Sequence, residues 1–421
     1  MNEIKGQISY LNILKNTTRD KLVDDYSTLI KADKGAGNQL SINRITLTNF
    51  RCYKQQRIEV DGRTVLLTGA NGAGKTNLLE ALSFLIPGRG LRQAKLGDIG
   101  RRSAKGHPLA AEWGIFAELL VNGNKLRIGT GSEYKNMLGN RSRGRDKRVI
   151  KIDGKILKKQ AELGEYTSIQ WLTPNMDRLF LEGASGRRRF LDQIISGLYP
   201  EHASPVAAYG HSVRNRNKLL KEANPDAVWL SSVEESIARH GVAIAVRRQE
   251  VIERLQTECK KNNGSFPGSL IKMVGQMEEW LSSAPALVVE DRLQAALYDT
   301  RKSDAVNGYT SIGPHRSDFR VHHSETGMAA ESCSTGEQKS LLIGIILAVA
   351  KLQTDHKGFT PLLLLDEIAA HLDESRRASL FQLIMEMGAQ AWITGTEKEL
   401  FDYFGEKAQH FSIENGELIR I

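Results

Sequence analysis

Cysteine is scarce in this sequence, and its few copies lie far apart. Only Cys52, Cys259 and Cys333 occur among the 421 residues. An odd number of cysteines without a Cys-x-x-Cys pair or a Cys/His spacing argues against both a disulfide framework and a zinc site. Three reduced thiols in a reducing compartment are the simpler interpretation.

Long apolar runs are missing as well. No run of about 18 apolar residues occurs, which argues against a membrane-spanning helix. The N-terminus also lacks the apolar centre of a signal peptide. We therefore expect a cytoplasmic protein.

Acidic residues are outnumbered by basic ones. The 58 Lys and Arg residues against 49 Asp and Glu give a formal net charge of +9 and a pI near 9.3. This excess suits a phosphate-rich partner, but it also occurs in proteins that bind no nucleic acid, so charge alone leaves both alternatives open. The length, with 40% hydrophobic and 25% charged residues, indicates a globular protein of about two or three domains.

Four segments differ in their residue patterns. Residues 1–40 are polar and carry mixed charges, and we interpret them as a disordered N-terminal extension or as a misassigned start. Residues 41–175 carry strand-like runs and predict the N-terminal part of an α/β head. Residues 176–305 have helical spacing interrupted by prolines, which predicts a lobe of several short helices without a long coiled coil. Residues 306–421 alternate strands and helices and predict the C-terminal part of the head.

Two kinds of strand are expected in the first part of the head. The runs 42–50 and 64–67 precede a glycine-rich loop and a helix at 77–84. The segments 111–130 and 147–157 alternate apolar and polar residues at a period of two and contain Asn-Gly and Asp-Gly turns, which predicts antiparallel hairpins.

The most specific motif is a glycine-rich loop between an apolar strand and a helix. It reads GANGAGKT and fits G-x-x-x-x-G-K-[ST] in the context that this motif requires. Glycines let backbone N–H groups approach phosphate oxygens, and the helix start adds a partial positive charge. Lys75 is expected to reach the β- and γ-phosphates of ATP, and the Thr76 hydroxyl to bind Mg²⁺. The predicted ATP-binding residues here are Gly69, Ala70, Asn71, Gly72, Ala73, Gly74, Lys75, Thr76 and Asn77.

An apolar strand that ends in two carboxylates supplies the second half of the predicted site. Asp366 and Glu367 follow a run of four leucines about 290 residues after the loop. Asp366 is expected to hold Mg²⁺ through water, and Glu367 to polarise the water that attacks the γ-phosphate. An apolar strand with terminal acids is common by itself, and the preceding phosphate loop makes it specific. We therefore predict Glu367 and Lys75 as catalytic residues and Thr76 and Asp366 as metal ligands.

A Ser-Thr-Gly-Glu-Gln-Lys run opens an apolar helix before this strand. Ser334 or Thr335 can simply cap the helix, with Glu337 or Gln338 as the capping-box partner. Alternatively, the hydroxyl and the free N–H groups of this helix start bind an anion. The position of the run ahead of the acidic strand favours the second interpretation.

The same run resembles the signature motif of the ABC ATPases in its RecF/SMC variant. In such proteins this helix start caps the ATP that the phosphate loop of a second subunit holds. The resemblance therefore implies an ATP-dependent homodimer in which Ser334, Gly336 and Gln338 contact the partner's nucleotide and Asp373 lies at the interface. About 260 residues separate loop and signature; coiled-coil SMC relatives insert hundreds more there, and transport ATPases insert far fewer.

Further stretches are similar to the RecF family between about residues 42 and 400. The LTNFRCY stretch resembles the family's opening strand, whose arginine, here Arg51, approaches the nucleotide. The stretches LTP at 172–174 and RRRFLD at 187–192 resemble the beginning of the helical lobe. GPHRSD at 313–318 resembles a Gly-Pro-His-Arg-x-Asp block.

The resemblance implies an α/β fold: an ABC-type P-loop ATPase head with an antiparallel β-subdomain and an inserted lobe of short helices. It also implies a weak DNA-dependent ATPase that uses ATP and Mg²⁺, dimerises on ATP and clamps DNA. Its role would be recombinational repair and replication-fork recovery, with RecR- and RecO-like partners. Alternatives are an ATPase associated with a nuclease, a transport ATPase subunit, or a clamp that binds ATP without hydrolysing it. Ala370-His371 stands where the family usually has Ser-Glu, which leaves the hydrolysis rate open.

Basic residues gather in three clusters. The first lies at 141–159 and has glycines and serines in its first half, which we interpret as a mobile loop, and the others lie at 187–189 and 214–221. Because no aromatic residues interleave with these cations, we expect contacts to the phosphate backbone with little sequence readout. Ordinary solvated faces are the alternative for each cluster. The predicted DNA-binding residues are Arg141, Arg143, Arg145, Lys147 and Arg148.

Overall fold

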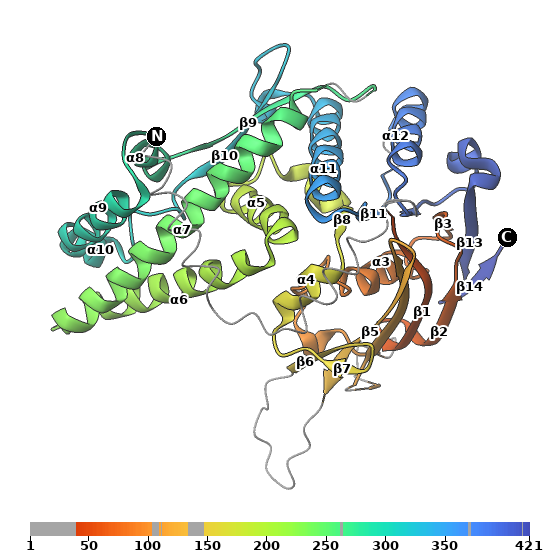
Figure 1. The fold of residues 1–421 in the computed structure, drawn as a ribbon, viewed down its shortest axis with the longest axis horizontal. Helices are drawn as coiled ribbons and strands as arrows, with labels where there is room; N and C mark the ends of the chain where they lie inside the picture. The colour runs from red at the N-terminus through yellow and green to blue at the C-terminus, as the bar shows by residue number, and fades with distance from the viewer. Residues whose placement is uncertain are drawn as a thin grey trace, which may run out of the picture.

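The computed structural model describes residues 39–102, 109–110, 112–133, 147–261, 264–368, 372–414 and 416–421. It contains a head with two six-stranded sheets and a helical lobe to one side (Figure 1). Residues 1–38, the greater part of the predicted N-terminal extension, lie outside these ranges. None of the helices in the described ranges is long and apolar enough to cross a membrane.

The core sheet of the head has the strand order β14-β13-β3-β12-β11-β8. All neighbouring pairs are parallel except β13 and β14. Parallel strands are covered on both faces and therefore need continuous apolar runs, which the fully buried β3, β8, β11 and β12 provide. The strands are β3 (Thr64–Thr68), β8 (Ile169–Leu172), β11 (Leu362–Leu365), β12 (Ala391–Thr394), β13 (Ala408–Glu414) and β14 (Glu417–Arg420).

The second sheet is the antiparallel β-subdomain, with the order β2-β1-β4-β5-β6-β7. The two predicted hairpin turns are present, and each places Asn122 or Asp153 and the following glycine at positive φ, as type I′ turns require. β2 was not expected as a strand. The members are β1 (Leu40–Phe50), β2 (Tyr53–Glu59), β4 (Gly114–Val121), β5 (Asn124–Glu133), β6 (Lys147–Ile152) and β7 (Lys155–Ile156).

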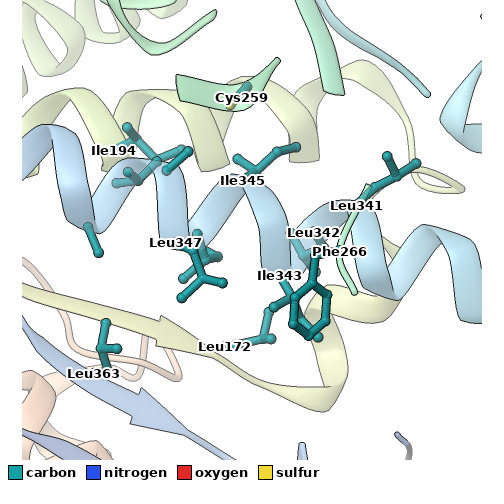
Figure 2. Packing of buried hydrophobic residues seen from close by; sticks show 14 of the residues in the cluster. Leu172, Ile194, Cys259, Phe266, Leu341, Leu342, Ile343, Ile345, Leu347 and Leu363 are labelled. Carbon is teal, nitrogen blue, oxygen red and sulfur yellow. The ribbon is translucent and has the colours of Figure 1, made fainter. Parts of the chain in front are cut away.

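Helix α11 (Thr335–Lys357) lies at the centre of the larger hydrophobic core. Figure 2 shows Ile345 directed toward the helix that carries Cys259, and Leu347 directed toward Leu172 and Leu363 of the sheet. Both sides of α11 are covered along its middle, and residues 341–350 are accordingly apolar all round. The other head helices are α3 (Lys75–Ser83), α4 (Leu163–Tyr166), α5 (Ala184–Leu198) and α12 (Glu374–Met387).

Helix α7 (Ala227–Cys259) connects the lobe to the head. With 33 residues it is longer than the short helices that the sequence predicted. Its first turn is capped by Asp226, whose side chain accepts the N–H groups of Val228 and Trp229. Its first half packs in the core of the lobe and its last turns pack in the head core. The remaining elements of this region are α6 (Ala203–Leu219), β9 (Ser269–Val274), α8 (Gln276–Ser283), α9 (Ala286–Asp299), α10 (Arg301–Asn307) and β10 (Asp318–His323), where β9 pairs with β10. Short 3-10 turns occur at Leu96–Asp98, Gln160–Glu162, Pro174–Arg178, Pro200–His202, Ala330–Ser332 and Glu399–Lys407.

A buried amide joins the two large sheets. Gln390, which precedes β12, is fully buried. Its Oε1 accepts the N–H of Ile42 at 2.8 Å, and its Nε2 donates to the carbonyl of the same residue at 3.0 Å. These bonds lie where the register between β1 and β4 shifts, so the side chain satisfies backbone groups that the ladder leaves unpaired.

Replacing this amide should weaken the head. In Gln390→Leu, the backbone N–H and carbonyl of Ile42 lose their partners in a dry environment, at a cost of roughly 1–3 kcal/mol for each group. We expect a clearly lower thermal unfolding midpoint by calorimetry. Gln382→Leu is the matched control because Gln382 lies exposed on α12. Equal midpoints for the two variants would show that the amide does not hold the sheets together.

Candidate nucleotide site

The glycine-rich loop connects β3 to α3, as predicted. Gly69 and Gly74 have φ angles of 143° and 122°, which favour glycine. A Cβ atom at Gly69 would lie 2.4 Å from the carbonyl oxygen of Ile413. At Gly74 the Tyr53 hydroxyl donates to the backbone carbonyl at 3.0 Å, and a Cβ atom there would lie 2.9 Å from that hydroxyl. Both glycines are therefore required for the loop to fit between its neighbours.

Lys75 begins α3 and is almost fully buried. Its ammonium group donates to the carbonyls of Gly69 and Ala70 at 2.6 and 3.1 Å. Burial lowers the pKa of this ammonium, while the negative charges of Glu367 and Asp366 act in the opposite direction. The structure thus places a lysine over the loop with both predicted carboxylates in electrostatic reach.

Asp366 meets the loop helix at the carboxyl edge of the core sheet. Its Oδ1 accepts hydrogen bonds from the hydroxyls of Thr76 at 3.1 Å and Thr394 at 2.8 Å. Burial raises the pKa of this carboxyl, and the two hydroxyl donors partly counteract the shift. A hydroxyl and a carboxylate side by side form the kind of hard oxygen set that Mg²⁺ prefers.

Glu367 occupies the turn directly after β11. Its φ is +52°, a left-handed conformation that costs a non-glycine residue about 1–3 kcal/mol and often marks a functional site. Its backbone N–H donates to the hydroxyl of Thr394 at 2.8 Å. Thr394 therefore holds both acidic residues at once, although it was not among the predicted site residues. Its place at the end of β12, a parallel neighbour of β11, was the signal that could have found it.

Arg51 lies beside the loop helix, where an ion pair holds it. Its guanidinium contacts Glu80 of α3 through two hydrogen bonds of 2.8 and 2.6 Å. Asn77, the last predicted residue of the loop region, donates to the Cys52 sulfur at 3.2 Å and accepts from Arg92 at 2.8 Å. Glu80 and Arg92 were not predicted from the sequence.

The signature run begins α11 at the surface. Ser334 is the N-cap and forms a capping box with Glu337, so the structural interpretation of this serine is correct. The cap leaves Ser334 and Gly336 exposed and therefore accessible to another molecule. Gln338 is buried instead and donates to the carbonyl of Cys333 at 2.8 Å. In this structure the Gln338 side chain is therefore not accessible, and its contact with a partner's nucleotide stays a prediction.

Asp373 caps α12 through its side chain, which accepts the N–H of Arg376 at 2.9 Å. It is exposed, as an interface residue has to be. The departure from the family pattern at Ala370 and His371 lies outside the described residues.

The predicted DNA-binding residues differ in their exposure where the structure describes them. Arg141, Arg143 and Arg145 lie outside the described ranges, and Lys147 is exposed at the start of β6. The prediction for Arg148 is wrong. Its side chain is buried and donates to the Thr130 hydroxyl and to the carbonyls of Phe84, Ile86 and Gly88, because the alternation of the strand turns it inward.

The other basic clusters are also partly structural. Arg187 forms an ion pair with Asp318 at 2.8 Å. Arg216 is fully buried in the lobe and pairs with Glu234 and Asp304. Exposed cations in these clusters are Arg189, Arg214, Lys218 and Lys221.

Known proteins resemble this chain over most of its length. The family model of the RecF/RecN/SMC N-terminal domain matches residues 41–417. The DNA replication and repair protein RecF of Allorhizobium ampelinum is 44% identical over 379 residues, which cover 90% of this chain and 98% of that protein. The RecF protein of Agrobacterium fabrum is 43% identical over 381 residues, again covering 90% and 98%.

Solved structures show the same fold. A structure of the recombination mediator protein RecF with ATP, in the RecFOR pathway, superimposes with a TM-score of 0.77 at 24% identity and covers 92% of this chain and all of that one. The elements that hold the loop, the acidic strand and the signature helix therefore follow an ABC/SMC-type head with an inserted lobe. On the match of its sequence to the family model and to these relatives, the chain belongs to the RecF family.

Proposed function

We propose that this protein is a RecF-type DNA repair factor that dimerises on ATP, clamps DNA and releases it after slow hydrolysis. The observation that carries the proposal is the shared carboxylate of Asp366, which brings the end of β11 to the first turn of the loop helix. That arrangement supports an ATP site with Mg²⁺ in a head whose relatives are DNA replication and repair proteins.

Each group of residues in the site would have its own role in ATP binding and hydrolysis. The loop amides and Lys75 would bind the phosphates, and Thr76 with Asp366 would hold Mg²⁺, which supplies charge neutralisation of the phosphates when bound. Glu367, whose backbone N–H bonds to Thr394, would orient and deprotonate the attacking water. Arg51 stays a proposed nucleotide contact.

A second copy of the chain would complete the site. The exposed signature residues Ser334 and Gly336 offer a hydroxyl and backbone N–H groups at a helix start, which suit a phosphate. Asp373 would lie at the same interface. Family membership argues against a transport ATPase subunit and against a nuclease-associated ATPase.

DNA would be held through its phosphate backbone by the basic stretch around Arg141, Arg143, Arg145 and Lys147, without Arg148. Its ATPase would be weak and stimulated by DNA. RecR- and RecO-like proteins are the proposed partners, because solved relatives act in the RecFOR pathway. The cytoplasmic location stays a prediction.

A first test traps the dimer. Glu367→Gln keeps the shape of the side chain but removes the base, so ATP should bind without being hydrolysed. By analytical ultracentrifugation with ATP, Mg²⁺ and DNA, we expect a DNA-bound dimer that persists in the variant. Lys75→Ala serves as the control that should not dimerise. A Glu367→Gln protein that sediments as a monomer under all conditions would refute the proposed ATP sandwich.

A second test addresses Thr394. Thr394→Val removes the hydroxyl that donates to Asp366 and accepts from the Glu367 N–H, so the acids lose their alignment. We expect kcat for ATP to fall roughly tenfold, since about 1.4 kcal/mol corresponds to that factor and a hydrogen bond to a charged group is worth at least this much. Thr360→Val is the matched control, because Thr360 is also buried but precedes β11, at the opposite edge of the core sheet from Thr394. Equal kcat values in both variants would speak against a role of Thr394 in hydrolysis.

A third test addresses DNA. Changing Arg143, Arg145 and Lys147 together to Ala should weaken DNA binding and flatten its salt dependence, by about 0.9 in the log–log slope for each lost phosphate contact. The measurement is a DNA titration at several salt concentrations. The control changes Lys260, Lys261 and Lys351, an exposed cluster directly after α7 and on α11. An unchanged slope in the first triple variant would remove this stretch from the DNA site.

A further inference from the structure

A fully buried carboxylate lies directly behind the phosphate loop. Glu80 is on α3, one turn after Thr76, and is 0% exposed. It accepts two hydrogen bonds from Arg51 at 2.8 and 2.6 Å and one from Arg92 at 3.3 Å. A buried charge is costly unless it is paired, and a carboxylate close to a phosphate site would also repel the ligand. The positive charges of Arg51 and Arg92 compensate the buried carboxylate and reduce its repulsion of a phosphate.

The two arginines differ in their hydrogen bonds and in the exposed fraction of their side chains. Arg51 follows the end of β1 in a left-handed conformation with φ +52°, and its third nitrogen donates to the carbonyl of Asp98 at 2.7 Å. Its side chain is 19% exposed, whereas that of Arg92 is 40% exposed. Arg51 is therefore the anchored member of the cluster, and Arg92 is the accessible one.

Arg92 faces the nucleotide site. Its Nη1 donates to the Oδ1 of Asn77 at 2.8 Å, and Asn77 directly follows Thr76 at the start of the loop helix. Burial raises the pKa of the Asp366 carboxyl, and the positive charge of Arg92 is near enough to oppose this shift slightly. Glu80 and Asn77 thus hold one guanidinium beside both halves of the site.

We propose that Glu80 is a positioning residue of the nucleotide site, which fixes Arg92 so that its guanidinium neutralises the terminal phosphate of a nucleoside triphosphate. This inference rests on the proposed ATP binding. A guanidinium held in place before binding loses little conformational entropy when it meets a phosphate. Its effect falls on the terminal phosphate, so Glu80 contributes to the preference for ATP over ADP.

A purely structural role of Glu80 makes a different prediction. The cluster joins the end of β1 to α3 and to the segment around Asp98, so its loss would lower stability in either case. A structural tie would weaken ATP and ADP binding to the same extent. Positioning of Arg92 would weaken ATP binding selectively, and the ratio of the two dissociation constants separates the two roles.

The experiment is a double-mutant cycle on the full chain. Glu80→Gln, Arg92→Gln and the combined variant are compared with the wild type by equilibrium binding of Mg²⁺-ATP and Mg²⁺-ADP, together with thermal unfolding. Glu118→Gln is the matched control, because it removes the partner of Arg44 in a 2.6 Å ion pair on the β-subdomain, away from the loop. This control should leave both dissociation constants unchanged.

We expect each single variant to weaken ATP binding about tenfold, the factor for one lost charge-assisted hydrogen bond, and ADP binding by less than about threefold. The combined variant should lose no more than Arg92→Gln alone, because Glu80 acts through that arginine. Losses that add in the combined variant, or equal losses for ATP and ADP, would overturn the proposal.

Two further outcomes are distinguishable. Arg92→Gln leaves the Arg51–Glu80 pair intact, so an unchanged preference for ATP in this variant overturns the proposal even if Glu80→Gln does not fold. A wild-type protein that binds neither nucleotide would instead refute the proposed function itself.

Discussion

The carboxylate of Asp366 is the point on which the site depends. Two hydroxyls from separate parts of the chain, Thr76 and Thr394, donate to one of its oxygens. This is possible because β3, β12 and β11 run parallel in adjacent positions, so their carboxyl ends meet at one edge of the sheet. The order of the strands thus brings Thr76 and Asp366, which are 290 residues apart in the chain, within hydrogen-bond distance.

The sequence predicted those parts of the site that are local in the chain. The phosphate loop and the acidic strand are contiguous runs whose residue types follow from their chemistry. Glu80 and Arg92 could not be found in this way, because an isolated ion pair has no pattern in the sequence until the fold brings the partners together. The prediction for Arg148 was wrong for a related reason. A basic run shows where positive charge is concentrated, but the alternation of side chains along the strand decides which cation is buried.

For the fold, too, the sequence predicted the elements that have a local residue pattern. Period-two alternation and Asn-Gly or Asp-Gly turns located the antiparallel hairpins, and leucine-rich runs located the parallel strands β3 and β11. The start of α7 was missed because Val228 and Trp229 in its first turn are apolar but exposed, and because its first residue is set by the cap of Asp226. The core around α11 depends on contacts with α5, α7 and the sheet, which no local spacing records. The capping box of Ser334 illustrates that one residue can cap the start of a helix and still be exposed to another molecule.

The length of α7 has a mechanical meaning. Its last turns are fixed in the same core as the signature helix, while its first half is embedded in the lobe. A helix of 33 residues is roughly 50 Å long at about 1.5 Å per residue. A tilt of only about 5° at the head end would therefore carry its far end through roughly 4 Å. A small rotation of the head would therefore be amplified along this helix into a larger displacement of the lobe.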